Sequence, residues 1–449
     1  MERSTETTAN AIIELKAVGK SFRSGSGSAR PVLDNVDLSL HAGEIVALLG
    51  RSGSGKSTLL RIMAGLIGSD SGQVLYKGLP LYGTARDISM VFQSFALFPW
   101  LTVQQNVELG MEARGIPAET REKRATAAVE MIGLSGFEGA LPRELSGGMR
   151  QRVGIARALV LEPEILLMDE AFSALDVLTG ERLRDDILDL WESGQIPTKA
   201  MLVVSHNIEE AVMMADRVLI FASDPGRIRY ELAIKLPRPR DVESEAVRAL
   251  VDDIYSQLTA GEARRGGRTS DAPPKLKLGD RLPEADVTRM EGLLEILTLE
   301  PYLGRADLPH LADATELTDD ELLHVSSALA LMGFAQVVGG DILITELGQR
   351  YVAGNNTQRQ ALFGQQILTH IPLVAYIRHG LEQDPSGDLH ENLFLKLLRF
   401  TLSEAEAERV LKVAIEWGRY GEVYEYDYTS GVIRLPEADL LQAESEIAP

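Results

Sequence analysis

Short apolar runs with abrupt polar ends recur through the first 240 residues. Three of them read EIVALLG (Glu44–Gly50), EILLMD (Glu164–Asp169) and AMLVVSH (Ala200–His206). Apolar runs of this length without alternation are typical of strands buried on both faces of a parallel sheet. A long, mostly helical stretch, Leu101–Leu161, lies between the first two. The pattern predicts an α/β domain with a mostly parallel sheet and a helical subdomain.

Helical periodicity dominates the last third of the chain. Val287–Leu299 and Asp319–Gly333 are predicted amphipathic helices, and FAQVVGGDILITELG after them has a Gly-Gly hairpin signal. A weaker copy of helix, helix and hairpin follows in Glu391–Phe400, Ser403–Gly421 and Glu422–Leu435. The predicted fold class is therefore an α/β domain followed by a mainly α, winged-helix-like region, with two such units if the repeat is real.

The change of pattern sets the predicted domain boundaries. Val242–Thr259 is a predicted helix, and Gly261–Asp280 mixes Gly, Ser, Pro and charge without periodicity, which is typical of a linker. We predict an α/β domain over residues 1–240, a helix and linker over 241–282 and a C-terminal domain over 283–449.

Composition narrows the classes of function. The chain has no cysteine, which excludes disulfides, thiol catalysis and Cys-ligated zinc and fits a reducing cytosol. Neither a secretory signal nor a run of about 18 apolar residues is present, so a role at a membrane is expected to require a partner. The net charge is −21, and residues 281–449 contribute −16 of it, from 12 Lys and Arg against 28 Asp and Glu. A polyanionic partner is least expected there.

Gly50–Ser57 reads GRSGSGKS and matches the phosphate-binding pattern G-x-x-x-x-G-K-[ST]. The glycines let backbone N–H groups face phosphate, and the helix that follows adds its positive end. Lys56 is expected to reach the β- and γ-phosphates, and Ser57 to ligate Mg²⁺. The predicted phosphate contacts are Gly50, Ser52, Gly53, Ser54, Gly55, Lys56, Ser57 and Thr58.

An acidic pair ends the second buried run. Asp169 is placed to hold Mg²⁺, and Glu170 to polarise the attacking water. The alternative is a surface pair that caps the next helix. Beside a phosphate loop, the catalytic interpretation is favoured.

LSGGMRQR, Leu145–Arg152, resembles the signature motif of the ABC ATPases, and four further segments match that family in order. The resemblance implies an ATP-binding cassette that uses ATP and Mg²⁺, with its signature helix completing the site of a second subunit. By this resemblance Glu170, His206 and Gln93 are catalytic, Ser57, Gln93 and Asp169 hold the metal, and Phe22, Ser146, Gly147, Gly148 and Asp176 contact nucleotide. The sequence departs from the usual pattern at Met149, where Gln is common, and at Phe22, where Tyr is commoner.

Two observations favour transport over the other ABC classes. Gln93 lies only 53 positions before Ser146, which leaves no room for the coiled coil of chromosome-type ATPases, and one phosphate loop excludes a tandem translation-type protein. SFALFPWLTVQQNV, Ser94–Val107, carries an apolar cluster that is either local core or a docking groove.

The segment LFPWLTV resembles the ATPases of nitrate, sulfonate, taurine and bicarbonate importers. That branch implies a second ATPase copy, transmembrane permease subunits and, indirectly, a periplasmic solute-binding protein as partners, at the cytoplasmic face of the inner membrane. The acidic tail resembles the AAA-associated C-terminal domain of some members. A DNA-reading helix needs Lys, Arg, Asn or Gln, and Asp319–Gly333 has no Lys or Arg, so no nucleic acid is expected, although an ABC ATPase acting on nucleic acid is the alternative.

Overall fold

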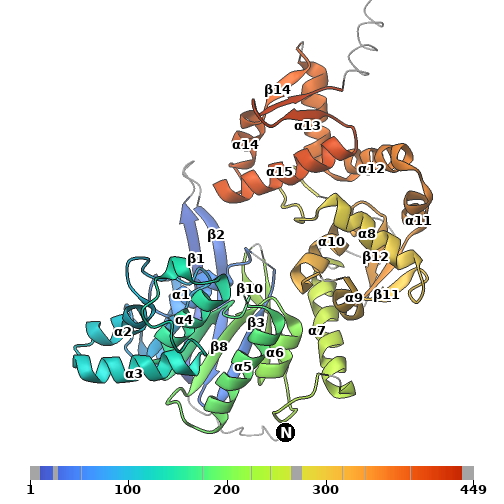
Figure 1. The fold of residues 1–449 in the computed structure, drawn as a ribbon. Helices are drawn as coiled ribbons and strands as arrows, with labels where there is room; N and C mark the ends of the chain where they lie inside the picture. Colours follow the sequence, from blue (N-terminus) through green and yellow to red (C-terminus); the bar gives the residue numbers. More distant parts are fainter. Residues whose placement is uncertain are drawn as a thin grey trace, which may run out of the picture. The chain divides into compact units, whose positions relative to one another are not determined.

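The computed structural model describes residues 11–23, 29–51, 53–173, 175–223, 225–242, 244–263, 276–315, 317–338, 340–384 and 386–436. They fall into two compact units that divide between Leu250 and Val251 (Figure 1). Among the described residues, no helix is both long and apolar enough to cross a bilayer.

A six-stranded sheet forms the centre of the first unit. Its order is β10-β9-β3-β8-β7-β6, and all neighbours are parallel except β9 and β10. The strands are β3 Glu44–Leu49, β6 Ile88–Val91, β7 Ile165–Asp169, β8 Ala200–Ser205, β9 Arg217–Ala222 and β10 Arg227–Ala233. The three apolar runs of the sequence are the neighbours β3, β8 and β7, and every residue of β7 and β8 is buried. The predicted, mostly parallel sheet is confirmed.

A second sheet in this unit was not predicted. It has the order β2-β1-β4-β5, with β1 Ala11–Arg23, β2 Ala29–His41, β4 Ser71–Tyr76 and β5 Leu79–Pro80, and β4 is antiparallel to both β1 and β5. Ile13 and Leu15 of β1 belong to the same buried cluster as Leu202 of β8. The second sheet therefore covers one side of the core.

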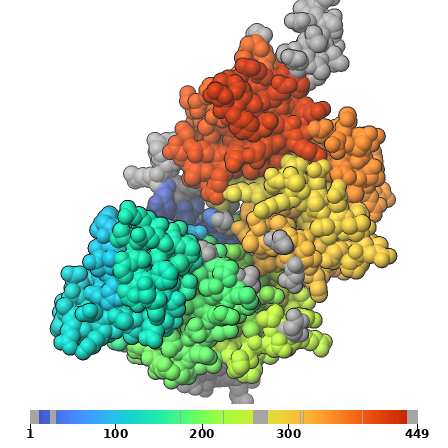
Figure 2. Space-filling model, in the orientation of Figure 1, coloured from blue at the N-terminus to red at the C-terminus, as the bar shows by residue number. Residues whose placement is uncertain are grey.

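The helices of the first unit include a separate helical lobe, α2–α4. They are α1 Lys56–Met63, α2 Val103–Ala113, α3 Ala118–Met131, α4 Gly147–Leu159, α5 Val177–Glu192 and α6 Ile208–Met214, with a 3₁₀ turn at Pro142–Glu144. Val107, Val129 and Val153 meet in a cluster of buried side chains. The cyan and teal atoms of this lobe lie beside the green remainder of the unit (Figure 2). The predicted helical subdomain is confirmed.

Helix α7, Glu245–Ala263, continues beyond the predicted helix end at Thr259 and into the predicted linker. Its second half belongs to the C-terminal unit. Tyr255 is buried, and its hydroxyl donates a hydrogen bond to Asp319. The unit boundary therefore falls inside a helix. Residues 264–275 of the predicted linker lie outside the described residues.

The C-terminal unit is mainly helical, as predicted, and it contains the same order of elements twice. Its first half has α8 Val287–Thr298, β11 Arg305–Asp307, α9 Leu308–Thr315, α10 Asp319–Leu331, β12 Ala335–Val338, β13 Asp341–Ile344 and α11 Glu346–Ala353. Its second half has α12 Asn356–His370, α13 Pro372–Gln383, β14 Asp388–His390, α14 Asn392–Leu398, α15 Glu404–Tyr420, β15 Glu425–Asp427 and β16 Val432–Arg434. The sheets β11-β13-β12 and β14-β16-β15 have equivalent orders.

Two tyrosines, the buried Tyr351 and the partly buried Tyr420, join the two halves of this unit. The hydroxyls of Tyr351 (α11) and Tyr420 (α15) are 2.8 Å apart, and Tyr420 donates to Glu291 of α8 at 2.7 Å. Phe363 of α12 packs edge-on to Tyr420. Burial raises the pKa of Tyr420 from 10.0 to about 12, so its hydroxyl remains a donor into the alkaline range.

Candidate nucleotide site

The predicted phosphate loop connects β3 to α1. Gly55 is the N-cap of α1 at φ 102°, a conformation that L side chains rarely adopt, and it leaves the helix start without a side-chain cap. A Cβ at Gly50 would lie 2.5 Å from the carbonyl oxygen of Phe221 on β9. Glycine is therefore required at both ends of the loop, for conformation at Gly55 and for space at Gly50. Ser52 lies outside the described residues.

Two buried polar groups in the loop fit an anion. The Lys56 amine is turned back onto the loop, where it donates to the carbonyl oxygens of Gly50 and, at 3.0 Å, Arg51. The Ser54 hydroxyl is buried and has no hydrogen-bond partner among the described residues, which leave out Ser52. A buried hydroxyl without a partner is costly, and phosphate oxygens would satisfy it and would also lie at the positive N-terminal end of α1.

The predicted metal ligands Ser57 and Asp169 are brought together from positions 112 residues apart. The Ser57 hydroxyl on α1 donates to Asp169 Oδ1 at the end of β7, at 3.0 Å. Burial raises the pKa of Asp169, while the hydrogen bond from Ser57 acts in the opposite direction. A hydroxyl and a carboxylate at the phosphate loop form an oxygen donor set suited to Mg²⁺.

Gln93 and Glu170 are also in direct contact. Gln93 follows β6, and its amide donates to Glu170 Oε2 at 2.8 Å. Glu170 has a left-handed backbone, with φ 50°. Its carbonyl oxygen accepts bonds from Gln151 at 2.9 Å and from the Ser173 hydroxyl at 3.0 Å. The carboxylate proposed as a base is thus fixed through both its side chain and its backbone.

His206 follows β8, which lies between β3 and β7. Ser205 is in register with Leu49, the residue before the phosphate loop, and Val204 is in register with Asp169. Carboxyl ends of neighbouring parallel strands form one edge. The sheet order therefore places His206 at the edge shared by the phosphate loop and the acidic pair.

The remaining predicted nucleotide contacts are Phe22, Ser146, Gly147, Gly148, Asp176 and Thr58. Phe22, near the end of β1, is 47% exposed, and the Lys20 amine lies 5.6 Å from its ring centre. Ser146 is the N-cap of α4, its hydroxyl accepting from Met149 N, so Gly147 and Gly148 begin that helix. Asp176 caps α5 by accepting from Thr179 N at 3.1 Å. Thr58 lies in the first turn of α1.

The sequence reading missed two residues of α4. Gln151 contacts the carbonyl of Glu170, and Arg157 contacts the carbonyls of Phe95 and Ala96 in the loop after Gln93. The sequence does contain one signal for Arg157: it is the single charged residue in the otherwise apolar segment VGIARALV, Val153–Val160, and a charged side chain there needs a buried partner. Met149, where the family often has Gln, instead packs partly buried against the core of the helical lobe.

An exposed aromatic pair lies in the loop before α2. Phe98 and Trp100 are 39% and 69% exposed, and their rings pack edge-to-face with centres 5.5 Å apart. Leu97, in contrast, packs against the lobe core. Asn106 is fully buried, and its side chain bonds to Phe98 and to the carbonyl oxygens of Leu101 and Thr102. The loop is therefore held firmly with its two aromatic rings outward.

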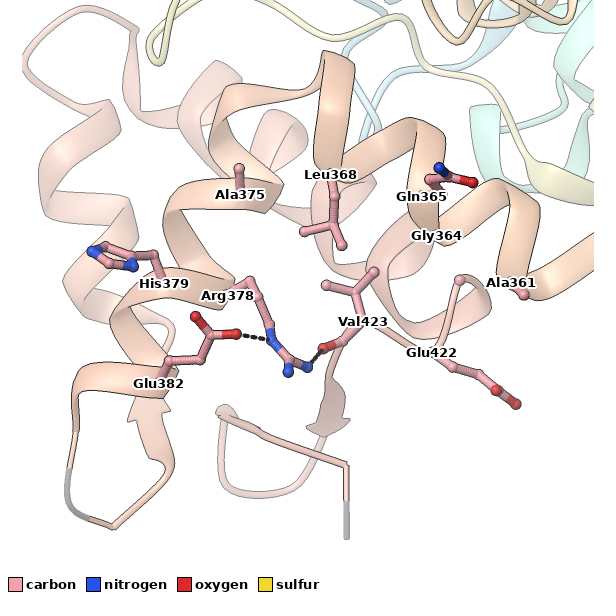
Figure 3. A pocket seen from close by; sticks show the side chains of 11 residues that line it. Ala361, Gly364, Gln365, Leu368, Ala375, Arg378, His379, Glu382, Glu422 and Val423 are labelled. Atoms are coloured by element: carbon pink, nitrogen blue, oxygen red, sulfur yellow. Dashed lines mark hydrogen bonds and ion pairs between the residues drawn. The ribbon is translucent and has the colours of Figure 1, made fainter. Parts of the chain in front are cut away.

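The C-terminal unit has an open groove of about 620 Å³ between α12, α13 and residues 421–423 (Figure 3). Arg378 crosses its floor and donates to Glu382 and to the Val423 carbonyl, both at 2.7 Å. None of the predicted site residues lines this groove.

Comparison with known proteins matches the two units of the chain to two different families. The model of the ABC transporter family matches residues 33–173, and that of the C-terminal AAA-associated domain matches residues 309–427. The nitrate import ATP-binding protein of Synechocystis is 44% identical over 225 residues, which cover 50% of this chain and 83% of the relative. The taurine import ATP-binding protein of Pseudomonas syringae is 40% identical over 243 residues, 54% of this chain and 90% of the relative. The solved structure of a dimeric ATP-binding cassette with bound ADP and phosphate is 35% identical to this chain. The alignment covers 50% of this chain and 100% of the solved chain, with a TM-score of 0.46.

Proposed function

Because the chain belongs to the ATP-binding subunits of the ABC transporter family, we propose that it hydrolyses ATP to drive an importer for a small oxyanion-like solute. The observation that carries the proposal is a pair of hydrogen bonds beside the phosphate loop. Ser57 bonds to Asp169 and Gln93 bonds to Glu170, and the buried Ser54 hydroxyl of the loop is available to bind an anion. The similar nitrate and taurine import proteins support the class of solute.

In this proposal each predicted site residue contacts one part of the ATP, the metal ion or the attacking water. Backbone N–H groups of the loop and Lys56 hold the β- and γ-phosphates, and Phe22 stacks on the base. Ser57, Asp169 and Gln93 hold Mg²⁺, which neutralises charge on the phosphates when bound. Glu170 accepts the proton of the attacking water, and His206 contacts the γ-phosphate from the edge of β8.

We further propose that the working form is a dimer, either of two identical chains or with a related cassette. The chain has one phosphate loop and one signature segment. Helix α4 starts at Gly147 and Gly148 after its N-cap Ser146, and such a helix start favours an anion. In a head-to-tail dimer that anion is the γ-phosphate held by the partner.

The membrane partner is proposed to dock at Phe98 and Trp100. A permease dimer that carries the solute across the inner membrane, supplied by a periplasmic binding protein, places this subunit peripherally at the cytoplasmic face. Exposed aromatics on a firmly held loop are typical interface anchors.

Replacing Phe98 and Trp100 together by Ala is expected to weaken association with the permease by about thirtyfold to a thousandfold. Each buried anchor typically contributes about 2 kcal/mol, and the upper value applies where the two losses add. Basal ATP hydrolysis and thermal unfolding are expected to remain unchanged. Co-purification with the permease and solute uptake measure the effect. Tyr82→Ala is the matched control, because Tyr82 is 90% exposed elsewhere on the same unit. Unfolding of the double variant would instead assign the pair to the core.

The C-terminal unit is proposed to be two winged-helix units that bind protein rather than nucleic acid. The repeated element order supports the architecture. In α10 the first turn carries Asp319, Asp320 and Glu321. In α15 the guanidinium of Arg409 is paired with Glu284 at 3.0 Å. A net charge of −16 over residues 281–449 opposes approach to a phosphate backbone.

Separating the units is expected to change the ATPase rate or its coupling to transport by about fivefold or more, the usual size of regulatory coupling. A protease site inserted between residues 264 and 275 allows one sample to be compared before and after cleavage. The same insertion left uncut is the control. Salt-sensitive binding of duplex DNA by the full chain at micromolar concentration would contradict the protein-binding role and favour an ATPase that acts on nucleic acid.

A further inference from the structure

Three non-glycine residues at or near the Gln93–Glu170 hydrogen bond, here called the hydrolytic pair, have left-handed backbone conformations. Phe95 and Ala96, in the loop after Gln93, have φ 60° and 48°, and Glu170 has φ 50°. L side chains adopt this conformation uncommonly and at an energetic cost, and it is enriched at functional sites, although six non-glycine residues elsewhere in the described chain share it. What holds these three residues is therefore part of how the site works.

Helix α4 contacts the carbonyl oxygens of all three. The Arg157 guanidinium donates to Ala96 O at 2.6 Å and to Phe95 O at 2.8 Å, as a fork onto consecutive carbonyls. Gln151 donates to Glu170 O at 2.9 Å. The guanidinium of Arg150 lies 5.6 Å from the ring centre of Phe95.

The environment makes these bonds costly to lose. Gln151 is 1% exposed. Burial lowers the pKa of Arg157, and no carboxylate in the described part of the chain contributes to that shift. The guanidinium is thus held largely by carbonyl dipoles, and a buried donor that loses its acceptor is strongly penalised.

We propose that Arg157 and Gln151 are positioning residues, which hold the two partners of the Gln93–Glu170 hydrogen bond from a single rigid helix. The proposal rests on the ATPase function proposed above and deepens it. Ser146 of the signature segment is the N-cap of α4. If the γ-phosphate of ATP held by a second copy of this chain contacts Ser146, helix α4 connects that phosphate to Gln93 and Glu170 of the first copy.

Arg157→Met and Gln151→Met each remove the donors and keep an unbranched, flexible side chain, of equal length for Gln151 and shorter for Arg157. Each is expected to lower kcat about tenfold or more. The Kd for ATP is expected to stay within about twofold of wild type, because the phosphate loop does not depend on α4. Arg157→Lys, which keeps the charge but not the fork, should lie between. The double Met variant should lose little more than either single one, since releasing one partner already breaks the pair.

Arg114→Met is the matched control for this test. Arg114 is also half-buried in the helical lobe and also bridges two carbonyl oxygens, Leu161 O at 2.9 Å and Arg86 O at 2.5 Å, neither of them near Gln93 or Glu170. Its removal is expected to lower thermal stability without lowering the kcat of the folded enzyme.

The decisive measurements are kcat, ATP affinity and thermal unfolding of the full chain. Wild-type kcat in Gln151→Met and Arg157→Met would overturn the positioning role, as would a loss that only follows the unfolded fraction. If Arg157→Met fails to fold, Arg157→Lys and Gln151→Met carry the same test. Absence of hydrolysis in the wild-type chain with its permease would instead refute the proposed function itself.

Discussion

Replacing Glu170 by Gln is expected to lower ATP hydrolysis by about 10²–10⁴-fold while ATP binding persists, because the amide keeps the shape of the side chain and cannot accept the proton. The contact with Gln93 at 2.8 Å places this carboxylate in the predicted site, next to Asp169. With hydrolysis blocked, the ATP-bound dimer should accumulate. Phosphate release and size-exclusion chromatography with and without ATP measure the two effects.

Glu164→Gln is the matched control for this substitution. Glu164 precedes the other end of β7, where it pairs with Lys77 at 2.8 Å and Lys199 at 3.1 Å. Its replacement removes a carboxylate next to the same strand without touching the site, so hydrolysis should continue. Wild-type hydrolysis in Glu170→Gln would show that another group acts as the base.

Gly364→Ala is expected to destabilise the C-terminal unit by about 2 kcal/mol. In an open helix position the change would stabilise by about 1 kcal/mol. Here a Cβ would come closer than 3.0 Å to the carbonyl oxygen of Gly421, at the contact of α12 with the end of α15, and overpacking of this kind costs about 3 kcal/mol. For a unit of this size the melting temperature should fall by about 4–8 °C.

Gly292→Ala gives the opposite sign in the same unit. A Cβ at Gly292 of α8 would meet no other described atom within 4 Å, so alanine should stabilise the helix by about 1 kcal/mol. The melting temperature of the C-terminal unit should then rise by about 2–4 °C. Calorimetry of the full chain with and without ATP identifies the transitions, since ATP should raise only that of the cassette. A stabilising Gly364→Ala would mean that the two helices do not meet at these glycines.

Much of the first unit could be predicted from the sequence because its signals are local. The phosphate loop needs eight consecutive residues, and its glycines are required by backbone conformation and space within that turn. The buried strands β3, β7 and β8 are apolar runs that no other element of a soluble domain explains as well. The unpredicted elements, such as β11 and β14 with three residues each, are too short to leave a periodic pattern.

The sequence by itself determined which chemical groups are available: a phosphate-loop pattern, an acidic pair at a strand end, a glycine-rich helix start after Ser146, and an acidic tail. Only the tertiary structure decided which groups meet. Ser57 bonds to Asp169 across 112 positions, Gln93 to Glu170 across 77, and Arg157 to Ala96 across 61. Such contacts depend on the order of strands in the sheet and on the packing of α4 against it, and neither leaves a trace in local propensity or spacing. Tyr255 of α7 likewise finds its partner Asp319 only in the folded C-terminal unit, across 64 positions that no local pattern connects.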